Sequence, residues 1–122
     1  HSWLEARLRA ISAKACQALC EAAGCKPDDI SAYIGPHILG DEYEVSQELM
    51  DRFAAEFACI DASASCMLDL SAAIREALMD AGVEASSIVD TKLSTVRQND
   101  RFYSYRNEGG TCGRHAAIGV ML

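Results

Sequence analysis

The sequence predicts an α+β fold in which helices pack against a mixed β-sheet. Three segments place apolar residues at steps of three and four, which is the period of an amphipathic helix. Short runs at 30–35, 86–94 and 114–122 contain β-branched or small apolar residues and are predicted as strands. Because helices and strands alternate within 122 residues, we expect a single domain over 1–122 with a modest core.

The first helix is expected from about Ser2 to Ala23. Its apolar stripe comprises Leu4, Leu8, Ile11, Ala15, Leu19 and Ala22. Gly24 follows as the residue that ends the helix, because glycine adopts the left-handed backbone of a helix C-terminus at little cost. A turn over 26–29 precedes the first strand. After that strand, residues 36–40 form a bend that opens on a proline, whose ring fixes φ.

Two further helices are predicted in the middle of the chain. Apolar residues spaced by four indicate a helix from Ser46 to Phe57, with Ser46 near its cap. A third helix is expected over 70–81, where Asp69 is suited to cap the first turn and Gly82 to end the last. The stretch 59–67 between them is small and polar and is predicted as a loop.

Charge and hydropathy narrow the class of protein. The net charge is −7 with eleven basic residues spread along the chain, which argues against a nucleic acid or an anionic membrane surface as partner. No apolar run is close to the length of about 20 residues that a helix needs to span a bilayer. The first residues of the sequence show no signal-peptide pattern. We therefore expect a cytoplasmic protein.

The six cysteines are predicted mainly as small buried hydrophobes. They lie in ordinary amphipathic sequence, and no pair has the CxxC spacing of a zinc ribbon or a thioredoxin-type site. Cys16 and Cys20 stand four apart on one helix face, which is a possible spacing for a metal site, but core packing is the favoured interpretation.

The densest group of special residues is the stretch 101–115. Gly109, Gly110 and Gly113 permit a tight, irregular connection in which several backbone N–H groups point one way. Arg106 and Arg114 flank these glycines, so the stretch is a candidate anion site. The alternative is that the glycines only turn the chain into its final strand while the arginines pair with carbonyls or acids.

Two blocks of sequence resemble the YfiH-like, laccase-domain (polyphenol oxidase) family. The first is Ile-Gly-Pro-His-Ile-Leu-Gly-Asp-Glu-Tyr-Glu-Val at 34–45. The second comprises Ser-Thr at 94–95, Phe-Tyr-Ser-Tyr-Arg at 102–106 and Gly-Thr-Cys-Gly-Arg at 110–114. The blocks stand in the family's order, and the resemblance covers nearly all of this chain but only the C-terminal portion of a usual member.

The resemblance implies a YfiH-like α+β fold and a cytosolic enzyme with zinc or copper held by two histidines and a cysteine. Members are described as oxidising polyphenols with copper, or as cleaving purine nucleosides with phosphate and deaminating adenosine with zinc. Aligned on the family's helix motif His-Ala-Gly-Trp-Arg-Gly, His1 falls on the histidine ligand, whereas residues 3–6 depart from the motif. The other ligands would come from a missing N-terminal half or a second subunit.

For substrate, the resemblance implies a purine nucleoside and phosphate, with Arg106 and Arg114 as the residues expected to bind phosphate; it assigns no catalytic residue here. His37 with Asp41 and Glu42 is a further candidate metal or acid–base site, although an exposed loop histidine beside solvated carboxylates is the favoured interpretation. A similarity to the fold of a deamidating bacterial toxin suggests an amide hydrolase with Cys112 as nucleophile and His115 as base. A catalytically silent scaffold that binds a partner is the remaining alternative.

Overall fold

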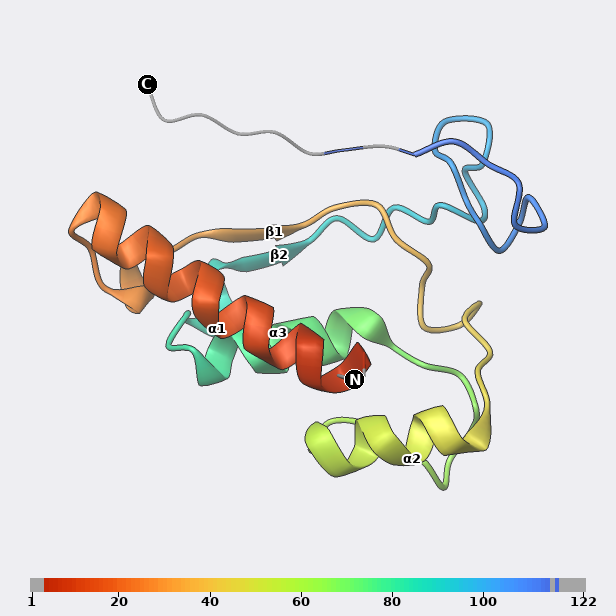
Figure 1. Ribbon diagram of the computed structural model, residues 1–122, viewed down its shortest axis with the longest axis horizontal. Helices are drawn as coiled ribbons and strands as arrows, with labels where there is room; N and C mark the ends of the chain where they lie inside the picture. The colour runs from red at the N-terminus through yellow and green to blue at the C-terminus, as the bar shows by residue number, and fades with distance from the viewer. Residues whose placement is uncertain (1–3, 115, 117–122) are drawn as a thin grey trace.

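The computed structural model describes residues 4–114 and 116. Its three helices are α1 (Leu4–Ala23), α2 (Gln47–Glu56) and α3 (Leu70–Asp80), and its strands are β1 (Ala32–Ile34) and β2 (Ile88–Asp90). A short 3₁₀ turn precedes each strand, at Pro27–Asp29 and Ala85–Ser87. The result is a mixture of helices and strands, with the C-terminal loops gathered beyond one end of the strands (Figure 1).

Within the described residues the sheet has two parallel strands, so the predicted mixed sheet is not seen there. Tyr33 pairs with Val89 at the centre of the register. The predicted strand 86–94 is shorter than expected, because its first residues form a 3₁₀ turn and Lys92 has a positive φ of 53°. The predicted last strand, 114–122, lies outside the described residues except for Arg114 and Ala116, which are in no strand.

The helix boundaries follow the predicted caps. The Ser46 hydroxyl accepts a hydrogen bond from the Leu49 N–H at 3.2 Å, and the Asp69 carboxylate accepts one from the Ala72 N–H at 3.1 Å. Gly24 and Gly82 have φ values of 67° and 103°, the left-handed region in which glycine is favoured. The predicted ends of α2 and α3 are therefore confirmed to within one residue.

The apolar stripe noted in the sequence of α1 is largely exposed. Ile11 is 61% exposed, and Leu4 and Leu19 are also exposed. Cys16 and Glu5 are the buried residues of this helix. The helix carries apolar residues on two faces, and the face with Cys16 and Leu8 packs on the rest of the protein. Periodicity alone did not distinguish these faces.

Two apolar clusters form the core. One surrounds α2 and contains Phe53 and Phe57, which are fully buried with ring centroids 5.8 Å apart. The other joins Cys16 of α1 to the strand residues Ile34 and Ile88. Together the clusters place α1 and α3 against one face of the sheet, an arrangement that Figure 1 also shows. No helix within the described residues is long and apolar enough to cross a membrane.

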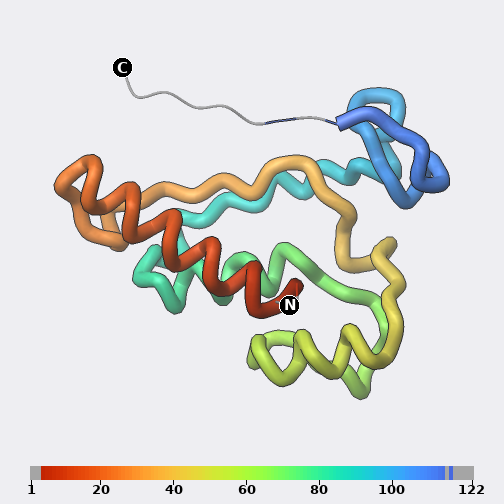
Figure 2. The backbone as a smooth tube through the Cα atoms, viewed as in Figure 1, coloured from red at the N-terminus to blue at the C-terminus, as the bar shows by residue number. Residues whose placement is uncertain are grey.

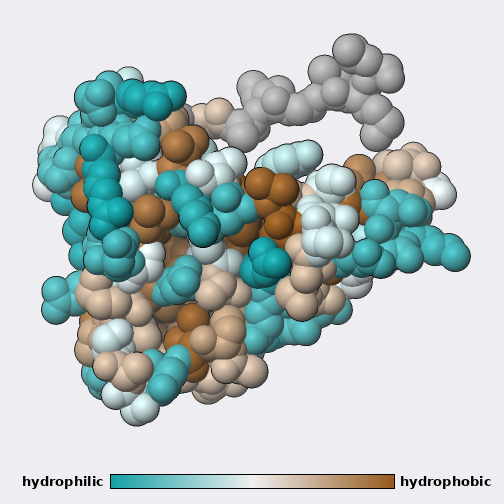
Figure 3. Space-filling model, turned by 180° about the vertical axis from the view of Figure 1, so that it is seen from behind, coloured by the Kyte–Doolittle hydropathy of each residue, from teal (hydrophilic) through white to brown (hydrophobic). Residues whose placement is uncertain are grey.

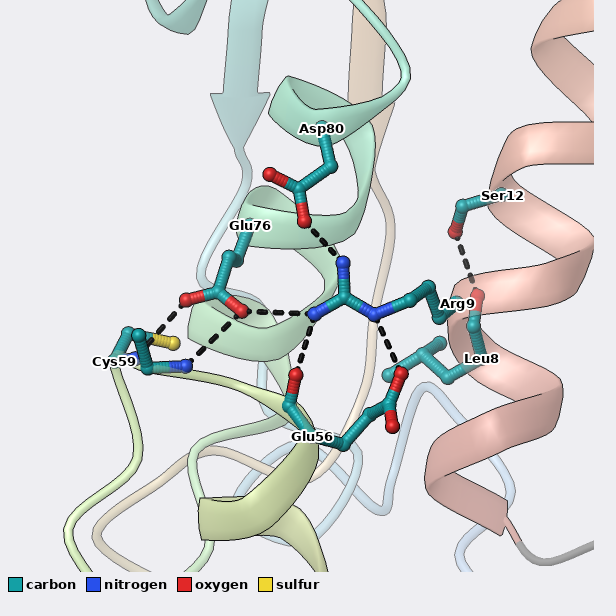
Figure 4. Close-up of polar contacts among 8 residues, drawn as sticks. Leu8, Arg9, Ser12, Glu56, Cys59, Glu76 and Asp80 are labelled. Atoms are coloured by element: carbon teal, nitrogen blue, oxygen red, sulfur yellow. Dashed lines mark hydrogen bonds and ion pairs between the residues drawn. The ribbon is translucent and has the colours of Figure 1, made fainter.

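Arg9 links the three helices. Its guanidinium forms ion pairs with Glu56 of α2 at 2.6 Å, with Glu76 of α3 at 3.2 Å, and with Asp80 (Figure 4). Glu76 in turn accepts backbone hydrogen bonds from Ala58 and Cys59, just after α2. The cluster therefore fixes α1 against both other helices and against the loop between them.

Candidate functional site

A pocket of about 330 Å³ lies where the proline bend meets the C-terminal loops. Its walls are Pro36, His37, Ile38, Tyr43, Leu70, Thr95, Tyr103, Ser104, Tyr105 and Arg106. The bend and the C-terminal stretch were the two segments that the sequence singled out, and the structure brings them together. The tube in Figure 2 shows the C-terminal loops turning back beyond the ends of the strands.

Internal hydrogen bonds hold the C-terminal loops in shape. The Glu108 carboxylate accepts from the Ser104 N–H at 2.8 Å and from the Asn99 side chain at 3.0 Å. The bond from the Ser104 backbone, followed by the bond from Asn99, lowers the pKa of Glu108. Together they outweigh the small rise in pKa that desolvation causes. Gly109 and Gly110 have φ values of 68° and 91° and allow the turn that follows. Seen from behind, the surface around these loops is largely hydrophilic (Figure 3).

We expect the order of this loop to fall in acid. Because the pKa of Glu108 is lowered in the folded state, its contribution is present above the ordinary glutamate pKa of about 4.3 and is lost as the pH falls through the folded value. Protection of the Ser104 amide from hydrogen exchange should therefore drop below about pH 4. Glu108→Gln should lower that protection at neutral pH, whereas Glu84→Gln, at an exposed position, should leave it unchanged; equal protection in all three proteins would contradict the role of Glu108.

Gly113 allows the ring of Tyr103, a residue of the pocket wall, to pack against the backbone. A Cβ at this position would lie 2.5 Å from the Tyr103 ring, which is well inside contact distance. The absence of a side chain lets the ring lie over the backbone. A second hollow, also of about 330 Å³, shares Tyr103 and Tyr105 with the first and is otherwise lined by Cys112, Gly113 and Arg114.

The two predicted phosphate-binding arginines line neighbouring hollows. Arg106 Nη1 donates to the Glu44 carbonyl at 3.1 Å, and its guanidinium lies 5.3 Å from the centre of the Tyr43 ring. Arg114 Nη1 donates to the Cys112 carbonyl at 3.3 Å and lies 3.5 Å from the Cys112 sulfur. Both arginines are exposed. Their role in binding phosphate stays a prediction, as does that of Cys112, because the suggested base His115 lies outside the described residues.

The candidate site of His37 with Asp41 and Glu42 is not formed in the structure. The two carboxylates form ion pairs with Arg97, at 2.6 Å and 3.2 Å. The hydrogen bond from Arg97 is the main reason that the pKa of Asp41 is lowered. The His37 ring instead contacts the Gly35 carbonyl at 2.8 Å through Nδ1.

Nothing in the sequence pattern indicated that Ser71 and Asp90 would lie near His37. The Ser71 hydroxyl lies 2.6 Å from His37 Nε2, across 34 positions of sequence. Ser71 also hydrogen-bonds the carboxylate of Asp90. Burial would raise the pKa of Asp90, but this bond, the Lys92 N–H and the charges of His37 and Lys92 lower it. Ser71, itself held by Asp90, therefore fixes the His37 ring in the wall of the pocket.

The described residues do not fit a metal centre. No group of three or more His, Cys, Asp or Glu within 4–114 and 116 is arranged to hold a metal ion. Both ring nitrogens of His37 have protein partners, and the sulfur atoms of Cys20 and Cys25 lie 3.9 Å apart. His1, the predicted metal ligand, lies outside the described residues.

With its apolar and aromatic walls and a few polar groups, the pocket has the character of a small-molecule site. Sequence comparison identifies the protein family to which the chain belongs. The profile of the family described as multi-copper polyphenol oxidoreductase laccase matches residues 1–122, and the chain belongs to that family. The resemblance seen in the two sequence blocks is thereby confirmed.

Curated relatives carry names of two activities. The chain is 32% identical over 120 residues to purine nucleoside phosphorylase YlmD of Bacillus subtilis, covering 93% of this chain and 43% of that protein. It is 35% identical over 98 residues to a purine nucleoside phosphorylase of Deinococcus radiodurans, covering 78% and 37%. Adenosine deaminase RL5, from an unknown prokaryotic organism, is also 35% identical over 98 residues, covering 75% and 37%.

The chain thus spans about two fifths of the length of the curated relatives that it matches. No solved structure matches it.

Proposed function

We propose that the pocket between the proline bend and the C-terminal loops binds a purine nucleoside together with phosphate, as part of a phosphorylase. The observation that carries this proposal is the meeting of three tyrosines and Arg106 in one hollow. The names of two relatives, both purine nucleoside phosphorylases, support the choice of substrate. Deamination of adenosine is a second activity, supported by the name of the third relative.

Each wall of the pocket offers a different kind of contact. Tyr103 and Tyr105 present aromatic rings on which a purine can stack, an interaction worth about 1–3 kcal/mol per base. The hydroxyls of Thr95 and Ser104, both on largely buried residues, are suited to hydrogen-bond polar edges of the nucleoside. The guanidinium of Arg106 is suited to hold a phosphate oxygen, since arginine binds phosphate through paired N–H donors.

The complete reaction is proposed for an assembly larger than this chain. Zinc or copper would orient or activate a reactant there, which is the chemistry that such ions supply in enzymes. His1 stays a proposed ligand, with the others coming from the portion of the relatives' length that this chain does not match. The described residues are proposed to bind and orient the nucleoside and to shield it from water.

Calorimetric titration with inosine in the presence of inorganic phosphate tests the proposal. Arg106→Ala should weaken inosine–phosphate binding about 10-fold or more, because a charged hydrogen bond is worth about 1.5–3 kcal/mol. Arg101→Ala is the matched control: it removes the same charge from the same loops, but Arg101 lies beside Phe102 and Gln98 rather than in the pocket wall. Equal affinity in the two variants, or no binding by the unmodified chain, would contradict the proposed site.

A further inference from the structure

The C-terminus of α1 places two thiols against each other. Gly24 has the left-handed conformation, and the Cys25 N–H donates to the Cys20 carbonyl at 3.1 Å, five residues back. This is the Schellman arrangement that commonly ends a helix. In that motif the side chains at these two positions usually make an apolar contact. Here they are both cysteines, and their sulfur atoms are 3.9 Å apart.

The surroundings favour contact between these two sulfurs. Both residues are half-buried and pack on the cluster that contains Ile30 and Val83. Burial, followed by the hydrogen bond and charge of Cys25, raises the pKa of Cys20. The two thiols therefore interact while remaining partly open to solvent, so that a small reagent can reach them.

We propose that Cys20 and Cys25 are a modification site that forms a reversible disulfide by exchange with a small disulfide such as oxidised glutathione. The thiolate of Cys25 attacks one glutathione sulfur, breaks the S–S bond and releases one glutathione thiolate. The thiolate of Cys20 then attacks the Cys25 sulfur of this mixed disulfide and releases the second. Two cysteine protons are lost, the protein gives up two electrons, and one oxidised glutathione becomes two reduced molecules.

The two sulfur atoms have only a short distance to close before the bond can form. The sulfur atoms must approach from 3.9 Å to the S–S bond length of about 2.05 Å, and the Schellman turn already holds the two backbones together. Cys16 is a weaker partner, because it is 6% exposed and stands one helical turn before Cys20 on the same rigid helix. Cys66 is engaged elsewhere, since its thiol donates to the Gln47 side chain at 3.3 Å.

The bond would lock the end of α1. It would fix Gly24 and the following turn against the cluster that supports β1 and β2. Because the bond constrains the unfolded chain, the oxidised protein should melt a few degrees, about 3 °C, above the reduced protein. This modification site is independent of the nucleoside pocket and of the activity proposed for it.

Incubation of the whole chain with oxidised glutathione, followed by mass spectrometry, tests the site. Cleavage after Glu21 separates Cys20 from Cys25, so a disulfide between them joins two peptides. We expect this joined product, with the loss of two hydrogens, in the unmodified chain and in the Cys59→Ser control, which removes an exposed thiol. The same product in Cys16→Ser would show that Cys20, rather than Cys16, is the partner of Cys25.

Cys20→Ser should stop the reaction at its first step. A stable glutathione adduct should then remain on Cys25, and the rise in melting temperature should disappear. The proposal is overturned if Cys20 and Cys25 both stay open to alkylation under conditions that fully modify the exposed Cys59. It is also overturned if the joined peptides persist in Cys20→Ser, because the bond would then involve another cysteine.

Discussion

Arg9→Ala should lower the free energy of unfolding by about 3 kcal/mol, because it removes the cation from among three carboxylates. Glu56, Glu76 and Asp80 would then repel one another in a chain whose net charge is already −7. The Arg9 guanidinium also lies 4.7 Å from the centre of the buried Phe57 ring, and this cation–π contact would be lost. This expected loss of stability is at the lower end of the range for a broken buried ion pair, since the cluster is partly exposed. Urea unfolding of the variant and of the unmodified chain measures this difference in the free energy of unfolding.

Lys14→Ala is the matched control for this variant. It removes the same charge from the same helix, but Lys14 lies on the exposed side of α1. We expect a change within about 0.5 kcal/mol for the control. Arg9→Lys should recover only part of the loss, because an ammonium group cannot reproduce the planar fork of the guanidinium. Similar losses for Arg9→Ala and Lys14→Ala would show that the cluster in Figure 4 does not stabilise the helices.

Gly82→Ala should destabilise the protein by about 2–3 kcal/mol, through backbone strain and a steric clash together. Gly82 ends α3 with a φ of 103°, which an alanine rarely adopts. A Cβ there would also lie 2.7 Å from Cβ of Pro27, and the proline ring has little freedom to move. The melting temperature should fall by roughly 5–10 °C.

Gly24→Ala separates the two causes. Gly24 likewise has a positive φ, 67°, but a Cβ at this position would meet no atom within 4 Å. We therefore expect a loss of about 1 kcal/mol, from backbone strain alone. If Gly24→Ala proved as costly as Gly82→Ala, the contact between the end of α3 and the Pro27 turn would not be the source of the difference.

Local chemistry explains what the sequence predicted well. Ser46 and Asp69 satisfy N–H groups within their own first turns, so each helix start is determined by neighbouring residues. Gly24 and Gly82 act on the same local scale at the helix ends. The proline bend and the C-terminal loops were singled out differently, through the resemblance of both segments to one family, and their meeting is seen only in the structure.

The errors arise where distant parts of the chain decide the outcome. Arg97 reaches back across 56 positions to Asp41 and removes that carboxylate from the predicted site. Ser71 comes to His37 from α3, and no spacing in the sequence links the two. For α1, both faces are apolar enough to be buried, and contacts with α3 and the strands decide that Cys16 is covered while Ile11 is exposed. Such choices depend on tertiary packing rather than on local pattern.

The central claim is that the bend and the C-terminal loops form one nucleoside-binding pocket. Amide chemical shifts of the isotope-labelled chain, recorded during titration with inosine and phosphate, test it most directly. We expect saturable shifts at Thr95, Ser104 and Arg106, and unchanged signals around Gly24 at the far end of α1. Shifts confined to other surfaces, or none at saturating inosine and phosphate, would contradict the claim.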